Sequence, residues 1–311
     1  MKNLTKTLKI NSQRFIQPFR SYIKNIIFSF CIIFLLLSCD GNKIEKKFPV
    51  QRNVIVLLDL SDRIILNKNQ PSLDKETISA IIDIFISSIK DTIIHYDKNF
   101  NLIKDKFSIR IADQKSMDID KEFFEKSLQF DFSDTKANNY KYILQDFQST
   151  IKQQLDTLYK LAAKSSNPKD YNGADLWKFF NEDLETMINE NAKNYLFIIT
   201  DGYLYFENYN NKIPNNNRRT DMKFMSELRK QDWENTFDKN DMGLIPLEKN
   251  FSNLKIAVLE IAPKDFWNEY DLIKKVWGKW FNEMGVKDEM IMFSKSGNSI
   301  DTKNKIKEFL K

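Results

Sequence analysis

The stretch that decides the fold is Asn-Val-Ile-Val-Leu-Leu-Asp-Leu-Ser-Asp-Arg, residues 53–63. It is a continuous apolar run that ends in a carboxylate and a hydroxyl, those of Asp59 and Ser61. A second run, Tyr-Leu-Phe-Ile-Ile-Thr-Asp-Gly at 195–202, ends in Asp201 and a turn glycine. Short continuous apolar runs are typical of buried parallel strands. Because ligand-binding groups collect outside the carboxyl ends of such strands, we expect Asp59, Ser61 and Asp201 to lie together.

Helical and strand patterns alternate along the rest of the chain. Apolar residues at helical spacing predict helices over 71–89, 142–162, 176–188, 272–284 and 303–310, and further strands are expected at 106–112, 254–262 and 290–293. Trp277 and Trp280 share one helical stripe, so we expect them in the core. The sequence therefore predicts an α/β fold with a doubly wound, mostly parallel central sheet flanked by helices.

One connection is far longer than the usual two to six residues. It runs from about 203 to 251, between two predicted strands, and contains an Asn-rich piece followed by a helical pattern from about 222 to 233. Such an insertion begins beside Asp201. It fits either a partner-recognition element or a tolerated surface excursion.

The amino terminus has the composition of an export signal. Residues 1–38 carry six basic and no acidic side chains, and the apolar run 26–37 is shorter than the ~20 residues of a membrane span. The run ends in Leu-Leu-Ser-Cys, which resembles the lipoprotein box of bacteria. By that resemblance Cys39 carries the lipid, palmitate included, and begins the mature chain. The alternative is an uncleaved anchor helix.

Both interpretations place the remaining chain in the bacterial cell envelope, anchored at a membrane and outside the cytoplasm. Residues 39–50 are short and polar, as expected of a tether, and 51–311 would form the folded domain. Without the signal, 42 basic side chains face 43 acidic ones, so the net charge is about −1. This balance offers no electrostatic support for binding nucleic acid. The only other cysteine, Cys31, lies inside the signal.

The endings Asp59-Leu60-Ser61-Asp62-Arg63 and Thr200-Asp201-Gly202, with Gly173-Ala174-Asp175 between them, resemble the von Willebrand factor A domain. That family carries a metal-ion-dependent adhesion site. The resemblance implies that Asp59, Ser61 and Asp201 bind Mg²⁺ or another divalent cation, and that an acidic residue of a protein partner completes the shell. Thr200 would line the same surface.

The sequence departs from the family pattern at two positions. Arg63 stands where a second serine is expected, and Ala174 appears in place of a threonine. An arginine offers no lone pair to a cation. Asp175 would partly compensate as a further metal ligand, although it is offset by one residue. Alternatively, Arg63 pairs with Asp59 or Asp201, takes the place of the cation and offers its charge to the partner's acid.

Enzymatic interpretations find less support. A phosphohydrolase of the haloacid dehalogenase type needs a second acid two residues after Asp59, where this chain has Ser61. The single histidine, His95, and the lack of a Gly-x-Ser-x-Gly motif argue against a nucleophilic triad. We therefore expect a non-catalytic protein-binding or assembly module, with a metal-dependent phosphohydrolase of the envelope as the alternative.

Overall fold

The computed structural model describes residues 50–96, 103–114, 119–135, 139–171, 173–206, 217–264 and 267–311. The predicted signal peptide, Cys39 and all of the tether except Val50 lie outside these ranges. In the part of the chain that is described, no helix combines the length and apolarity needed to cross a membrane.

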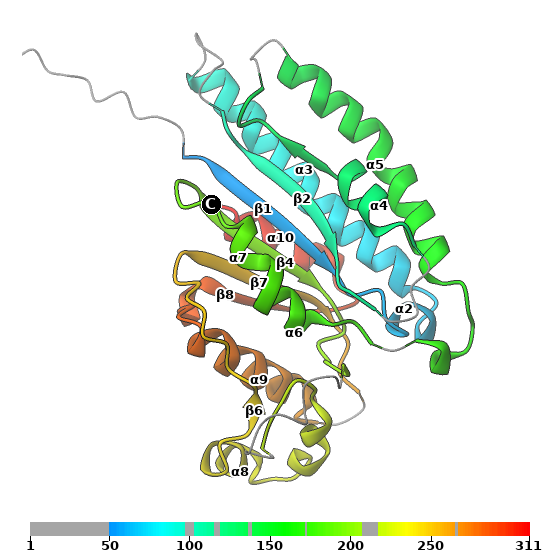
Figure 1. Cartoon of the computed structure of the whole chain (residues 1–311), viewed down its shortest axis with the longest axis vertical. Helices are drawn as coiled ribbons and strands as arrows, with labels where there is room; N and C mark the ends of the chain where they lie inside the picture. The colour runs from blue at the N-terminus through cyan, green and yellow to red at the C-terminus, as the bar shows by residue number, and fades with distance from the viewer. Residues whose placement is uncertain are drawn as a thin grey trace, which may run out of the picture. The chain divides into compact units, whose positions relative to one another are not determined.

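Six strands form one sheet in the order β3-β2-β1-β4-β7-β8 (Figure 1). All neighbouring pairs are parallel except β2 and β3. The strands are β1 Arg52–Leu58, β2 Lys106–Ile111, β3 Gln129–Asp131, β4 Lys193–Ile199, β7 Leu254–Ile261 and β8 Ile291–Lys295. From β1 the chain builds the sheet outward in one direction through β2 and β3, and from β4 it builds the other half through β7 and β8. This arrangement confirms the predicted doubly wound α/β fold. Its switch point lies where β1 and β4 end.

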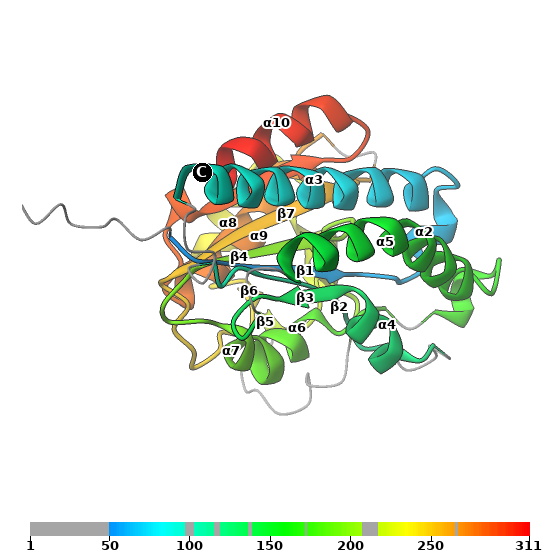
Figure 2. The ribbon, with the colours of Figure 1, turned by 90° about the horizontal axis from the view of Figure 1, so that it is seen from above.

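Helices cover both faces of the sheet (Figure 2). Along β1, Val54, Val56 and Leu58 pack with α3, α5 and α10, whereas Ile55 and Leu57 pack with α6, α9 and the segment after β4. This alternation follows from the two-residue period of a strand. The helices of the two layers and their connections are α2 Arg63–Leu66, α3 Gln70–Tyr96, α4 Lys121–Ser127, α5 Tyr140–Ala162, α6 Leu176–Lys178, α7 Leu184–Met187, α9 Glu269–Glu283 and α10 Ser299–Phe309.

The described part of the long insertion is packed, not loose. It contains the short parallel pair β5 Arg218–Arg219 and β6 Gly243–Leu244, the 3₁₀ turns Lys223–Leu228, and α8 Trp233–Lys239. The helix predicted over 222–233 is therefore wrong. Met225 and Leu228, three residues apart, share one side of a 3₁₀ helix, which buries both, and the α-helix begins only at Trp233.

The insertion shares a core with α9. Phe237, Leu244 and Phe251 belong to the same buried cluster as Trp277 and Trp280, both fully buried as predicted. Arg218 holds the two together, because it forms ion pairs with Asp241 of the insertion at 2.5 Å and with Glu283 of α9 at 2.8 Å. The described part of the insertion is thus part of the folded domain and covers α9.

Candidate functional site

The register of β1 and β4 brings the two predicted strand endings together. Leu58 lies opposite Ile199, so Asp59 follows directly beside Thr200. The Thr200 hydroxyl donates to Asp59 Oδ2 at 2.7 Å, and the Ser61 amide donates to Asp59 Oδ1 at 3.0 Å. Asp59 is only 2% exposed, and both of its carboxylate oxygens accept a hydrogen bond. Its position and orientation are therefore fixed by the strand ends.

Arg63 has a partner that the sequence did not indicate. Its guanidinium donates to both carboxylate oxygens of Asp74, at 2.7 and 2.9 Å, and to the backbone carbonyl of Asp59 at 3.1 Å. Asp74 also accepts from Gln70 and from the Tyr159 hydroxyl, each at 2.9 Å. The alternative in which Arg63 pairs with the Asp59 or Asp201 carboxylate is thus wrong. Arg63 forms a buried pair with Asp74, which lies near the start of α3.

Burial lowers the pKa of the Arg63 guanidinium, but Asp74 raises it, and the more distant charges of Asp59 and Asp201 add to this, so its pKa lies above the ordinary value. The pKa of Tyr159 lies well above its ordinary value because of burial and because Asp74 is close. The Arg63 guanidinium is consequently charged at physiological pH and the Tyr159 hydroxyl is neutral.

Asp201 lies half-buried at the end of β4. Its Oδ1 accepts from the Tyr203 amide at 3.0 Å. Burial and the negative charge of Asp59 raise its pKa to about 7, against a smaller opposing effect of Arg63. Asp62 is half-buried too. Its burial and, to a smaller extent, the negative charge of Asp59 raise its pKa. Arg63 acts to lower the pKa of Asp201 and Lys264 acts to lower that of Asp62, but burial and the charge of Asp59 outweigh both.

Asp175 has other partners. It caps the short helix α6 by accepting from the Lys178 amide at 2.9 Å, and its own amide donates to the Asp113 carbonyl at 2.8 Å. Burial raises its pKa to about 6. Lys121 and Lys178 both bind the Asp113 carboxylate. The predicted metal ligand Asp175 thus caps α6 and binds the backbone of Asp113 after β2. None of its hydrogen bonds reaches Asp59 or Asp201.

An aromatic and basic rim continues the edge beyond Asp201. The rings of Tyr203 and Tyr205 stack with centroids 5.8 Å apart. Lys264 lies over both rings, and its Nζ donates to the Tyr205 hydroxyl at 2.6 Å. Tyr205 is 37% exposed. The Tyr203 hydroxyl donates to the buried Glu269 at 2.8 Å, which anchors the rim to α9.

A second buried carboxylate at this edge was also not predicted. Glu260, at the end of β7, accepts from Thr77 of α3 at 2.6 Å and from Ser296 after β8 at 2.7 Å. Its φ is 63°, a left-handed conformation that costs energy in residues other than glycine.

The sequence did contain a sign that Asp74 is buried, since it stands four residues before Ile78 and therefore on the buried side of its helix. For Glu260 the sequence gives no comparable signal.

The residues fit a divalent cation poorly. In the described ranges no three acidic, histidine or cysteine side chains lie close enough together to share a metal ion. Arg63 and Ala174 supply no side-chain oxygen to a cation, and Asp175 is directed to Lys178. Ca²⁺ takes six to eight oxygen ligands and Mg²⁺ an octahedral shell, so Asp59, Ser61 and Asp201 would leave most positions to water.

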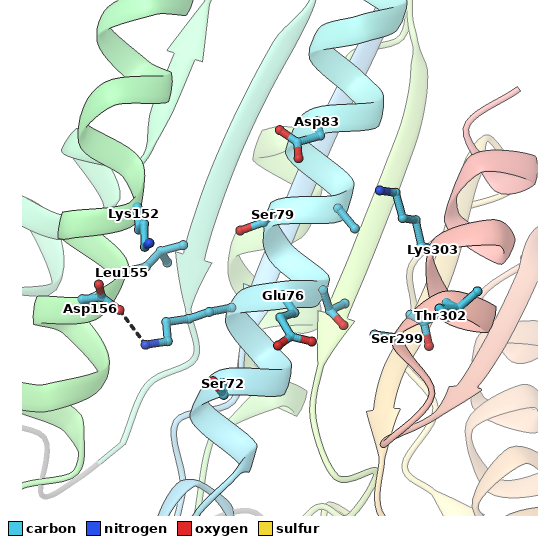
Figure 3. A pocket seen from close by; sticks show the side chains of 14 residues that line it. Ser72, Glu76, Ser79, Asp83, Lys152, Leu155, Asp156, Ser299, Thr302 and Lys303 are labelled. Carbon is cyan, nitrogen blue, oxygen red and sulfur yellow. Dashed lines mark hydrogen bonds and ion pairs between the residues drawn. The ribbon is translucent and has the colours of Figure 1, made fainter.

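A groove of about 560 Å³ lies elsewhere, over α3, α5 and α10 (Figure 3). None of the predicted site residues lines it. Its charged side chains are Lys75, Lys152 and Lys303 against Glu76, Asp83 and Asp156, and Lys75 pairs with Asp156 at 2.5 Å. With equal numbers of both signs, the groove has no net charge with which to attract a charged ligand.

Comparison with known proteins gives little further information. No protein-family model and no curated protein matches the sequence. Among solved structures the chain is similar to proximal thread matrix protein 1 from the mussel byssus, at 10% identity and a TM-score of 0.32 over 84% of this chain and 47% of that one. It is also similar to the pilus adhesin SpaC from Lactobacillus rhamnosus GG, at 11% identity and a TM-score of 0.40 over 85% of this chain and 31% of that one. This chain thus spans less than half the length of either protein, and at these TM-scores neither likeness carries an argument.

Proposed function

We propose that the chain is a non-catalytic binding or assembly module of the bacterial cell envelope, held at a membrane through lipid on Cys39 and facing away from the cytoplasm. The lipoprotein-like box and the resemblance to the von Willebrand factor A domain support this proposal. Its ligand is a protein partner, bound where β1 and β4 end.

One observation carries the proposal: a rigid polar centre lies beside an exposed aromatic rim. Asp59 is held by Thr200 and the Ser61 amide, and Arg63 by Asp74, so the centre is preorganised. Tyr205 and Lys264 stand next to it at the surface. Tyrosine is among the residues that dominate protein interfaces, and Tyr205 is exposed beside this fixed polar centre.

The family resemblance implies a divalent cation such as Mg²⁺ that bridges this centre to an acidic residue of the partner, but the oxygen donors of the described residues fit such an ion poorly. The alternative route, in which Arg63 offers its own charge to that acid, loses support, because Arg63 is only 3% exposed and is already paired with Asp74. Partner recognition then depends on Ser61, Asp62, Asp201 and the rim.

Capture of the partner from native envelope extract tests the proposal. The full-length chain, displayed in detergent micelles, is compared with its Tyr205→Ala variant and with Tyr142→Ala as a matched control, a tyrosine on α5 that is 70% exposed. We expect Tyr205→Ala to weaken capture about tenfold or more and Tyr142→Ala to leave it unchanged. Equal capture by all three proteins would refute the proposed surface.

The anchor is tested separately by metabolic labelling with a palmitate analogue. Label is expected on the wild-type protein and not on Cys39→Ser, which should leave the membrane fraction. Labelling that persists in the variant would contradict lipid attachment at Cys39.

A further inference from the structure

The two edges of the central sheet differ in how they are protected from pairing with another chain. β3, at one edge, has only three residues, Gln129–Asp131, and ends in the charge of Asp131. β8, at the other edge, has five, and its first three, Ile-Met-Phe at 291–293, are apolar and half-buried. Among the described residues β8 pairs with β7 alone. Proteins usually protect such an edge with charges, proline or a very short strand, but β8 carries its one charge at its end, on Lys295.

The side chains of β8 continue the apolar faces of the sheet up to this edge. Ile291 and Phe293 pack against the cluster that contains α9, and Met292 packs against the cluster that contains α3 and α10. A groove of about 1000 Å³ lies beside the strand on the α9 side, where Ile291 and Phe293 line it together with Trp233 of α8 and residues of α9. The edge therefore offers backbone hydrogen-bonding groups, apolar side chains and space to a further strand.

The charges around β8 are complementary to those of a second copy of the same strand. Asp288 and Glu289 directly precede the helical turn's end and the strand, Lys295 ends the strand, and all three side chains are exposed. Lys295 lies over the ring of Tyr270 and forms no ion pair with the described residues. Glu289 has only a long contact of 4.0 Å with Lys287 among them. When two copies of β8 run antiparallel, the acidic start of each lies beside the basic end of the other.

The register follows from the regular part of the strand. β8 pairs with β7 without interruption from Ile291 to Phe293, and the register shifts beyond that point, so the regular edge is centred on Met292. A two-fold axis through Met292 places Ile291 opposite Phe293 of the second copy, on the α9 face. The same axis places Glu289 opposite Lys295 of the second copy. The strand is thus complementary to itself, with apolar pairs at its centre and opposite charges at its ends.

We propose that the chain forms a two-fold symmetric dimer through the edge of β8, in which antiparallel pairing of the two strands joins the two central sheets into one. A two-fold interface uses the same patch on both copies and therefore requires this self-complementarity. The association is separate from the proposed capture of a partner at Tyr205 and does not rest on it.

Exchange of the end charges tests the dimer. The full-length chain in detergent micelles is studied by sedimentation velocity over a range of concentrations, as the wild type, as Glu289→Lys, as Lys295→Glu and as an equimolar mixture of these two variants. Within each variant, like charges meet at both ends of the paired strands, whereas the mixture brings opposite charges together again. The matched control is Lys307→Glu on the exposed surface of α10.

We expect the wild type and the control to dimerise, each single variant to dimerise about tenfold more weakly, and the mixture to recover the wild-type affinity. A wild type that stays monomeric would overturn the proposal. Variants that dimerise as well as the wild type would overturn it too, since the association would then use another surface.

Cross-linking tests the register even if a charge variant folds poorly. Met292→Cys is introduced into the full-length chain with Cys31→Ser and Cys39→Ser, because opposed residues of antiparallel strands have Cα atoms about 4.5–5.5 Å apart, within reach of a disulfide. Mild oxidation should link two Met292→Cys chains and leave the control Phe123→Cys, an exposed position on α4, unlinked. Equal linking of the two variants, or linking of neither, would overturn the proposed pairing.

Discussion

The hydroxyl of Thr200 donates to Asp59 Oδ2 at 2.7 Å and so joins the ends of the two strands at which the sheet changes direction. The same hydroxyl oxygen accepts from the Gly202 amide at 3.2 Å. One side chain thereby sets the geometry of both loops that form the candidate site.

Replacing Thr200 with valine should destabilise the fold. The change keeps the shape of the side chain but leaves the buried Asp59 oxygen without its donor, which costs about 1–3 kcal/mol. Thr200→Ser keeps the hydroxyl and should cost less. Urea unfolding of the two variants measures the difference, and a loss in Thr200→Val no larger than that in Thr200→Ser would contradict the dominant role of the hydroxyl.

Arg63→Met should cost about 3–5 kcal/mol of folding free energy, because it leaves the Asp74 carboxylate buried without its counter-ion. The double variant Arg63→Met, Asp74→Leu removes both charges and should recover much of that loss. Thermal unfolding of the two single variants and the double variant completes a mutant cycle. Additive losses would contradict a tight coupling between these residues.

Stability should fall as the pH rises through about 7. The pKa of Asp201 is about 7 in the folded state against an ordinary value of 3.8. The folded state therefore binds the proton more tightly, its advantage is complete below pH 3.8, and it is lost as the pH passes 7. Asp201→Asn should remove this contribution and be more stable than the wild type at pH 8, by only about 1 kcal/mol, because solvent reaches part of the Asp201 side chain and screens its charge.

Chemical denaturation at pH 5.5 and pH 8 measures this change, with Asp83→Asn on the exposed side of α3 as the control. An unaltered pH dependence in Asp201→Asn would show that Asp201 does not retain its proton.

Glu260 allows backbone strain to be separated from hydrogen bonding. Glu260→Ala and Glu260→Gly both lose the bonds to Thr77 and Ser296, but only glycine adopts the φ of 63° without strain. We expect both variants to be less stable than the wild type and the glycine variant to be more stable than the alanine variant by about 1 kcal/mol. Unfolding in guanidinium measures the stability of both variants. An alanine variant more stable than the glycine variant would show that the backbone of Glu260 is not strained.

Generic phosphoester substrates should not be turned over. Asp59 accepts hydrogen bonds at both oxygens, and the position two residues later is Ser61, which is no general acid. A panel of such substrates with Mg²⁺ and Mn²⁺ checks this expectation. Turnover that disappears in Asp59→Asn would favour a phosphohydrolase.

The main helices and strands could be predicted from the sequence because their apolar residues recur at clear helical or strand spacings. The run of residues 53–58 could only be buried on both sides, and the stripe through Trp277 and Trp280 could only face a core. The antiparallel strand β3 was not predicted, since three residues at the sheet edge carry no readable period. Among the insertion residues, a 3₁₀ segment produced a spacing that resembled an α-helix.

Of the candidate site, the approach of the two strand endings that carry Asp59, Ser61 and Asp201 followed from the order of the strands. The partner of Arg63 did not, because an ion pair is decided in three dimensions, between a loop and a helix that approach only after the sheet is formed. Asp175 was expected near the cation from the family resemblance, yet its carboxylate accepts from the Lys178 amide of its own helix. Local capping took precedence over a distant site.

The packing of the insertion also bears on how this domain can be altered. Residues 217–251 cover Trp277 and Trp280 and supply Trp233, Phe237 and Phe251 to the same cluster. Excising the insertion to make a smaller protein would expose two tryptophans and create an adhesive, aggregation-prone face. A change of partner specificity is therefore better sought by resurfacing Tyr205 and Lys264 than by exchanging the insertion as a loop.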